Sequence, residues 1–346
     1  MAMESPLLLD AITAWSSTHL SLQDKSYETA AIAHRSTALN SLMTSLGSSN
    51  RDPEMELASC LIHCSLESIS GDTEQWFRHH VGAYEMIRSM AATGATADLD
   101  LRRFSTTFEG RWLLRSFAYH DIMMAVAEGR KPLLVSGEYW ADMGNVGADT
   151  YFGLASRIMF LISEISILDV DMANPAAAEE GLDGSFSASA FRIEQALISW
   201  TCGLSDNEQL VNLAEMYRSA ALIYIYRTLR QHRPEYTHVV VKKIERQVVD
   251  IVQRVQSMPA RCLAESSLLF PMFMAGGEAE DPGHVQVIRH RMLDIINERH
   301  FHNMEVVLKV LEEVWHLRAT GVSSPGGRKI DWKDVLARRR WMLSIT

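Results

Sequence analysis

The sequence predicts an all-α protein, and three observations carry that prediction. Apolar residues recur at every third or fourth position over long stretches, which is the spacing of one helix face. Three expected helix starts place serine or aspartate directly before proline, a common N-terminal signature of helices. No segment alternates apolar and polar residues in a sustained way, so we expect little or no sheet. With 346 residues, 47 % hydrophobic and 22 % charged, the composition is globular.

The clearest helical period lies between Val241 and Val255. Valine favours strands by propensity, but the period of 3.6 outranks that weak preference. A second amphipathic stretch, Val307–Trp315, repeats the spacing, whereas Ala220–Tyr226 is apolar all round and predicts a central buried helix. The first stripe consists of Val241, Ile244, Val248, Ile251, Val252 and Val255.

Capping signals mark where the predicted helices begin and end. Ser205 with Glu208 fits a capping box, and Gly71 and Gly321 are expected stops. The three expected starts are Ser5-Pro6, Asp52-Pro53 and Asp281-Pro282.

Three segments without a period are predicted to be loops. Ala91–Gly110 mixes small and charged residues, Asp171–Ala190 is rich in Ala, Gly, Ser and Glu, and Gly321–Lys329 is a Gly/Ser/Pro turn. We expect the 171–190 loop to be flexible. The helices on both sides of it are expected to pack into a single domain over residues 1–346.

Charge and cysteine content restrict the function classes. The formal net charge of −10 makes the chain a poor binder of nucleic acid, and we interpret Arg338-Arg339-Arg340 as a solvated helix face. Four irregularly spaced cysteines do not predict a disulfide framework. No basic signal segment opens the chain, and no apolar run is long enough for a bilayer. We therefore expect a soluble, intracellular protein with no membrane contact.

The C-terminal third carries the most specific pattern. An apolar, proline-containing segment leads through two glycines to Glu278, and helices bearing Ile-Arg-His-Arg and Glu-Glu-Val-Trp follow. The residues are Leu268–Ala279, Asp281-Pro282, Ile288–Arg291, Glu312–Trp315, Asp331-Trp332 and Trp341. This pattern resembles the end of the fungal-specific transcription factor domain, the regulatory domain of zinc-cluster transcription factors.

Other segments resemble the same family in the same order, so the resemblance covers essentially the whole chain. They are Ser5–Leu20, His80–Ala83, Tyr119–Ile122, Pro132–Leu134 and Tyr217–Leu229. The resemblance implies a large multi-helix bundle around a central buried helix pair, with a regulatory role. In the family, DNA is read by a separate zinc cluster of six cysteines. This chain has four cysteines and the resemblance begins almost at Met1, so we expect no direct sequence-specific DNA binding.

Several polar residues are candidates for a site. Tyr119, His120 and Asp121 are the best acid/base group, because histidine exchanges protons near neutral pH. Adjacent helical residues face apart, however, so Asp121 is not expected to pair with His120. Glu278 is expected either to cap a neighbouring segment or to reach into a cavity. Cys60, His63, Cys64, His79 and His80 are interpreted as core or structural residues, with no metal site.

Two hypotheses follow, neither with a cofactor, because the sequence contains no nucleotide-binding, metalloprotease or nucleophile-elbow motif. The first is a nuclear regulatory domain that binds a small hydrophobic metabolite or a protein partner, with homodimerisation among its expected properties. The second is a cytoplasmic cyclase, pericyclase or isomerase of fungal secondary metabolism, with His120, Tyr84 or Arg115 polarising a carbonyl. Tyr84, Arg115, Tyr119, His120 and Glu278 are the predicted ligand-binding residues.

Overall fold

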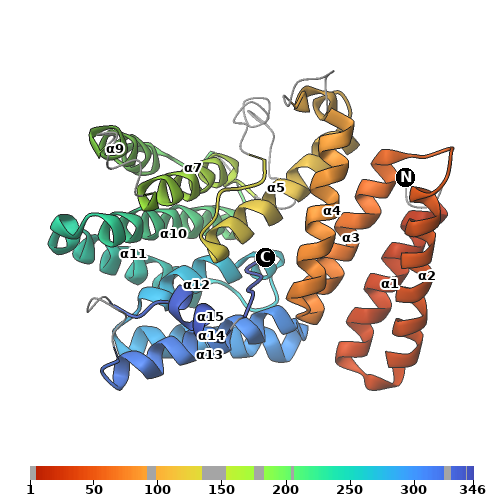
Figure 1. Ribbon diagram of the computed structural model, residues 1–346. Coiled ribbons are helices and arrows are strands. Elements are labelled where there is room, and N and C mark those ends of the chain that lie inside the picture. Colours follow the sequence, from red (N-terminus) through yellow and green to blue (C-terminus); the bar gives the residue numbers. More distant parts are fainter. Residues whose placement is uncertain are drawn as a thin grey trace. The chain divides into compact units, whose positions relative to one another are not determined.

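A computed structural model of the chain is shown in Figure 1. It describes residues 5–91, 99–134, 153–174, 183–203, 206–322, 329–339 and 341–346. Within these ranges the chain forms thirteen α-helices and no strand, which confirms the predicted all-α class. The helices group into two compact units, and each is described by itself.

The N-terminal unit is built on a helical hairpin. Helices α1 (Pro6–Gln23) and α2 (Glu28–Leu46) lie side by side, joined by the short 3₁₀ helix η2 (Lys25–Tyr27). Helix α3 (Pro53–Ser70) packs against α1, and α4 (Thr73–Ala91) packs against α3. The small side chains of Ala14 and Ala38 meet Leu66 in a fully buried cluster, so the three helices approach closely.

The remaining parts of the N-terminal unit are the 3₁₀ helix η3 (Leu101–Ser105), the first part of α5 (Phe108–Glu128) and residues Ile296–Asn303. Helix α5 therefore begins inside the expected loop Ala91–Gly110, of which residues 92–98 lie outside the described part of the chain.

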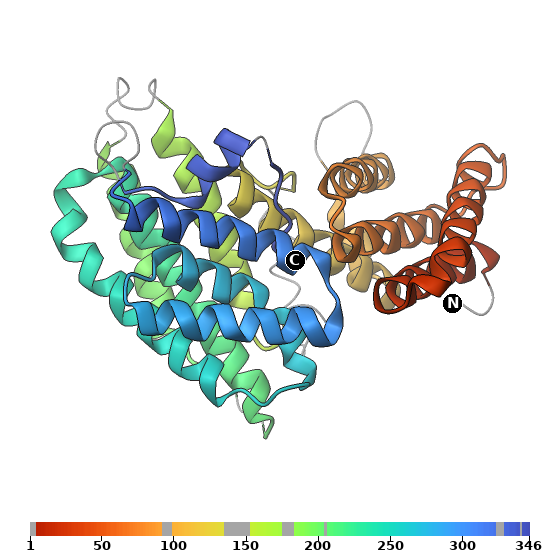
Figure 2. The ribbon, with the colours of Figure 1, turned by 90° about the horizontal axis from the view of Figure 1, so that it is seen from below.

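The C-terminal unit contains the other helices. They are α7 (Ser156–Ala173), α9 (Asp183–Ser199), α10 (Glu208–His232), α11 (Thr237–Ser257), α12 (Leu269–Glu278), most of α13 (Pro282–Arg299), most of α14 (His302–Ala319) and α15 (Trp332–Arg339), with the 3₁₀ helices η4 (Pro234–Tyr236) and η5 (Leu263–Ser267). Helix α10 is buried at every position from Ser219 to Thr228, and α12 is buried along its whole length. These two helices pack against each other and form the expected central buried pair. Figure 2 shows α13 and α14 side by side.

Most predicted caps are present. The side chains of Ser5, Asp52 and Asp281 accept hydrogen bonds from backbone N–H groups in the first turns of α1, α3 and α13. Gly71 and Gly321 both have positive φ angles, of 77° and 73°. The cap of α10 differs from the prediction: Asn207 accepts from the N–H groups of residues 209 and 210, and Ser205 lies outside the described residues.

The expected loop over 171–190 is shorter than predicted. Helix α7 continues to Ala173 and α9 begins at Asp183, while 175–182 lie outside the described residues. The period of α9 is hidden in the sequence because its buried stripe, Ala190, Ile193 and Leu197, starts only halfway along the helix. The residues from 184 to 189 are small apart from Phe186 and are exposed or partly exposed, so they give no periodic signal.

A buried carboxylate ties three helices of the C-terminal unit together. Asp169 on α7 accepts hydrogen bonds from His232 Nε2 on α10 at 2.9 Å and from Lys333 Nζ on α15 at 3.0 Å. Burial by itself raises the pKa of Asp169, but the His232 hydrogen bond and the Lys333 charge outweigh it and lower the pKa to about 2.

We expect this carboxylate to make stability depend on pH in the acid range. A lowered pKa means that its contribution, about 2 kcal/mol, is fully present above the unfolded-state value near pH 4 and is lost as the pH falls toward 2. The free energy of unfolding of the wild type and Asp169→Asn should therefore be compared by urea titration at pH 6 and pH 3. The difference between them should shrink by roughly half at pH 3. An unchanged difference would contradict the assignment.

Candidate functional site

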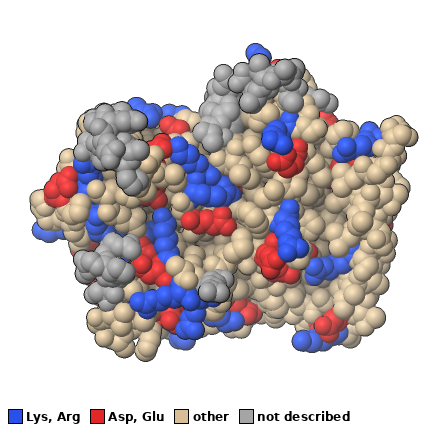
Figure 3. All heavy atoms as spheres, in the orientation of Figure 1, with Lys and Arg blue, Asp and Glu red and all other residues tan. Residues whose placement is uncertain are grey.

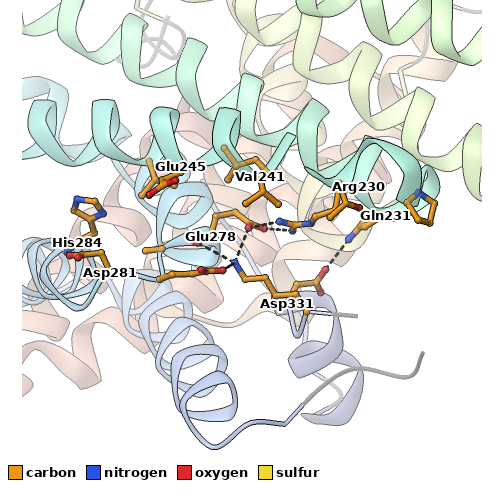
Figure 4. Close-up of a pocket in the computed structure, with 15 residues that line it drawn as sticks. Arg230, Gln231, Val241, Glu245, Glu278, Asp281, His284 and Asp331 are labelled. Carbon is orange, nitrogen blue, oxygen red and sulfur yellow. Dashed lines mark hydrogen bonds and ion pairs between the residues drawn. The ribbon is translucent and has the colours of Figure 1, made fainter. Parts of the chain in front are cut away.

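The C-terminal unit contains a cavity of about 610 Å³ between α11 and the segment that follows α12 (Figure 4). Figure 4 shows Val241 and Glu245 on the α11 side and Glu278 and Asp331 facing them. His284 and Asp281 lie at one end, and Arg230 and Gln231 lie at the other. Pro234, Thr237, Ile244, Val248, Ala279, Glu280 and Lys329 complete the lining.

The apolar wall of the cavity comes from the stripe on α11. Ile244 and Val248 are buried, whereas Val241 is 44 % exposed and points into the cavity region. The predicted stripe is therefore correct from Ile244 onward, but Val240 takes the buried position that the sequence suggested for Val241.

The floor of the cavity is charged and centres on Glu278. The carboxylate accepts two hydrogen bonds from Arg230, at 2.7 and 2.9 Å, and Lys329 Nζ lies 3.3 Å from Glu278 Oε2. Arg227 Nε lies 2.7 Å from Glu278 Oε1, an ion pair in which the N–H is not aimed at the oxygen. A bidentate arginine pair with additional cations is the arrangement that stabilises a buried carboxylate.

The electrostatics of the floor follow from this pairing. Burial by itself raises the pKa of Glu278, but the charges of Arg230, Arg227 and Lys329 outweigh it and hold the pKa well below its usual range. Burial likewise opposes the charged form of Arg230, and Glu278 outweighs burial so that the pKa of Arg230 is raised. Both side chains are therefore charged at neutral pH.

A second layer supports the floor. Asp331 accepts hydrogen bonds from Arg227 at 3.1 Å and from Gln231 at 2.9 Å. The guanidinium carbon of Arg227 lies 3.3 Å from the ring centroid of the fully buried Trp332, a cation–π contact. Arg318 donates to the carbonyl oxygens of Gly277 and Ile330. The floor thus connects α10, α12, α14 and the start of α15.

Two glycines allow α12 to place Glu278 at the floor. A Cβ atom on Gly276 would lie 2.8 Å from a methyl carbon of Leu311, and one on Gly277 would lie 3.0 Å from the Trp332 ring. Trp315 Nε1 also donates to the Gly276 carbonyl at 2.8 Å. The Gly-Gly-Glu sequence is therefore explained by close packing at the two glycines and by ion pairing at Glu278.

A second cavity, of about 560 Å³, shares Ala279, Glu280 and Lys329 with the first. Lys329 Nζ lies 2.6 Å from Glu280 Oε1, so this ion pair stands where the two cavities meet. Trp315 and Arg318 line the second cavity.

The family model for the fungal specific transcription factor domain matches residues 1–346. The chain belongs to this family. A curated relative, the transcriptional activator protein UGA3 of Saccharomyces cerevisiae, is 21 % identical over 372 aligned positions, which cover 93 % of this chain and 68 % of that protein. No solved structure matches the chain.

Of the five predicted ligand-binding residues, only Glu278 lines either cavity of this fungal transcription factor domain. Tyr84 lies on α4, with its ring 6.4 Å from that of Phe117. Arg115, Tyr119 and His120 are buried on α5 in the N-terminal unit. Their assignment to a ligand site stays a prediction.

The buried histidines of the N-terminal unit have structural surroundings. Burial, with the charge of His80, lowers the pKa of His120 to about 3, so the ring is neutral at physiological pH. Asp121 does face a histidine, but it is His80, whose Nε2 lies 3.5 Å from Asp121 Oδ1. Cys60, His63 and Cys64 are buried on α3. Among the described residues, no group of three or more His, Cys, Asp or Glu side chains is arranged to hold a metal ion.

The surface gives no broad basic area on the face that Figure 3 shows, as far as its residues are described; basic and acidic side chains lie intermixed. Arg338 and Arg339 are exposed on α15, as expected for a solvated face, and Arg339 pairs with Glu313 at 3.0 Å. None of the described helices is both long and apolar enough to cross a membrane.

The sequence reasoning missed Arg227, Arg230, Asp331 and Trp332 as parts of one site. A signal was available in α10, where Arg227 directly follows the apolar run Ala220–Tyr226, because a buried arginine requires a buried acid. In the sequence, the Asp331-Trp332 pair stands out only as part of the family-like pattern. Its partners lie about a hundred residues earlier, at Arg227 and Gln231.

Proposed function

We propose that this chain is a regulatory domain that binds a small molecule in the cavity between α11 and Glu278. The observation that carries the proposal is the cavity itself. Its volume of about 610 Å³ lies within the range of roughly 300–1,000 Å³ that is usual for ligand sites. Its lining combines an apolar wall with a few fixed polar groups, the usual composition of a pocket that binds a small organic molecule.

The charged floor supports a regulatory role. Glu278 connects the cavity to Arg227 and Arg230 on α10 and to Lys329, which precedes α15. A ligand that changes any of these ion pairs shifts the relative stability of two arrangements of the surrounding helices, which is what ligand control of a domain requires. Together with the family, this supports action in the nucleus as part of transcriptional control.

The enzyme hypothesis receives less support from the cavity. A general acid or base works best with a pKa near the operating pH. Glu278 is held ionised by three cations, so it is not placed to exchange a proton near neutral pH. Binding without turnover is therefore the function that we propose.

Two valines on α11 provide a matched test. Val241 and Val239 are 44 % and 42 % exposed, but only Val241 lines the cavity. The purified protein and the variants Val241→Trp and Val239→Trp should be incubated with an extract of fungal cells and examined by native mass spectrometry. We expect the wild type and Val239→Trp to retain a small molecule, and Val241→Trp to lose most of it because indole occupies the cavity.

The proposal would be overturned if the wild type retained nothing, or if both tryptophan variants retained the same molecule equally well. Unfolding curves of the two variants should be compared first, so that loss of binding is not confused with loss of fold. Because the exchanged side chains have nearly equal exposure, similar stabilities are expected.

A further inference from the structure

The cations of the cavity are already occupied. Both terminal nitrogens of Arg230 donate to Glu278, and the ammonium group of Lys329 contacts Glu278 and Glu280. An anionic ligand would have to take these cations from Glu278, whose side chain has no exposed surface. A buried carboxylate that loses its partners is strongly unfavourable, so the floor selects against anions.

The carboxylates of the cavity, in contrast, outnumber the cations. Glu245, Glu278, Glu280, Asp281 and Asp331 line it together with two cations, Arg230 and Lys329. Glu245 is exposed and makes no ion pair within the described residues. One oxygen of Asp281 accepts from two backbone N–H groups at the start of α13, which leaves the second oxygen without a cap bond. Among the charged side chains of the lining, the unused hydrogen-bonding capacity is therefore that of acceptors.

Glu245 lies on the same face of α11 as the apolar wall of the cavity. Val241, Glu245 and Val248 follow one another at spacings of four and three residues, so they lie on one face of α11. Figure 4 shows Glu245 next to Val241 on that side of the cavity, with Asp281 and His284 near the same end. A carboxylate thus lies directly beside an apolar surface, between Val241 and Val248 along the helix, as a ligand with an apolar body and a cationic head requires.

We infer that the cavity takes an amphipathic cation, a small molecule with an ammonium group held by Glu245 and an apolar body against Val241 and Val248. This inference rests on the proposed function, because it concerns the ligand of the same cavity. It adds a charge class to the hydrophobic metabolite expected from the sequence. It also assigns Glu245 the role of a specificity-determining residue, with Glu278 as the buried group that keeps the floor cations from attracting anions.

Three probes with one carbon skeleton separate charge from hydrophobicity: n-octylammonium, 1-octanol and octanoate. Each should be titrated into the full chain below its aggregation concentration, and the chemical shifts of labelled valine methyl groups should be followed. We expect octylammonium to bind about tenfold more tightly than octanol. We expect octanoate to bind the most weakly of the three. The shifts should centre on Val241 and Val248, and higher salt should weaken only octylammonium binding.

Variants then test the residue. Glu245→Gln is expected to weaken octylammonium binding by about three- to tenfold and to leave octanol binding unchanged. Glu208→Gln is the matched control, because it removes the same charge far from the cavity. Glu208 begins α10 and Arg230 lies near its end, so the two are roughly 30 Å apart at 1.5 Å per residue. This control variant should change neither affinity.

The outcomes distinguish the inference from the proposed function. If all three probes bind the cavity with equal affinity, or octanoate binds best, the cationic class is wrong while ligand binding stands. If Glu245→Gln and Glu208→Gln behave alike, the role of Glu245 is wrong. If no probe shifts the cavity valines, and Val241→Trp has no effect on retention of any molecule, both proposals fail together.

Discussion

Replacing Glu278 with alanine is expected to destabilise the C-terminal unit by about 3–5 kcal/mol, because removing one partner of a buried ion pair leaves the others unpaired. Arg227 is almost completely buried and loses its contact with Glu278 at 2.7 Å, and Arg230 loses both of its hydrogen bonds to the carboxylate. For a unit of this size the melting temperature should fall by about 10 °C. Thermal unfolding followed by circular dichroism measures the effect.

Glu280→Ala is the control for this experiment. Glu280 also pairs with Lys329, but its side chain is 73 % exposed, and exposed ion pairs contribute about 0–1 kcal/mol. The two glutamates are two residues apart and share Lys329, so the difference between the variants measures the effect of burial together with the pairing of Glu278 with Arg227 and Arg230. If Glu278→Ala melted within 2 °C of Glu280→Ala, as a rough threshold, the buried network would not be the stabilising element that its geometry implies.

Replacing Trp332 with alanine is the second change with a large expected effect. The indole is fully buried, lies against Gly277 and Phe273, and carries Arg227 on its face. Large-to-small changes of buried aromatic residues cost about 3–5 kcal/mol through lost transfer free energy and the cavity left behind. The free energy of unfolding, measured by urea titration, should fall by that amount.

Two further variants make the Trp332 result specific. Trp341 is 40 % exposed, so Trp341→Ala should cost about 1 kcal/mol or less. Within the part of the chain that the structure describes, Trp332 Nε1 is buried without a hydrogen-bond partner, so Trp332→Phe removes an unsatisfied donor while it keeps an aromatic ring beneath Arg227. It should therefore be much less destabilising than Trp332→Ala. Equal losses for alanine and phenylalanine would show that ring packing is not what matters at this position.

The local features of the fold were predictable because their causes are local. The stripe from Ile244 to Val255 follows from a period of 3.6 residues, and the caps at Ser5, Asp52 and Asp281 depend on side chains within three residues of the N–H groups they accept from. The order of the family-like segments was also readable along the chain, and the family match over residues 1–346 agrees with it.

Only one residue of the candidate site, Glu278, was predictable from the sequence. Glu278 stands out because a carboxylate follows two glycines after a strongly apolar run. The two roles expected for it, a helix cap or a side chain that reaches into a cavity, do not name its ion-pair partners. Its partners Arg227 and Arg230 lie about fifty residues earlier in the chain, and nothing in the spacing of the sequence brings α10 beside α12. For His120 the sequence could not show the burial that lowers the pKa of its ring to about 3 and so removes the proton exchange near neutral pH for which it was selected.

Hydrophobic period, capping residues and family pattern were therefore enough to indicate an all-helical domain of the fungal transcription factor family, because each is read from residues close together in the chain. The cavity, its acidic lining and the pairing of Glu278 depend instead on which helices pack together. Which helices pack together depends on contacts between residues far apart in the chain. Gly276 and Gly277 have no side chain, so Leu311 and Trp332 pack closely against them, and this packing places Glu278 beside Arg227 and Arg230.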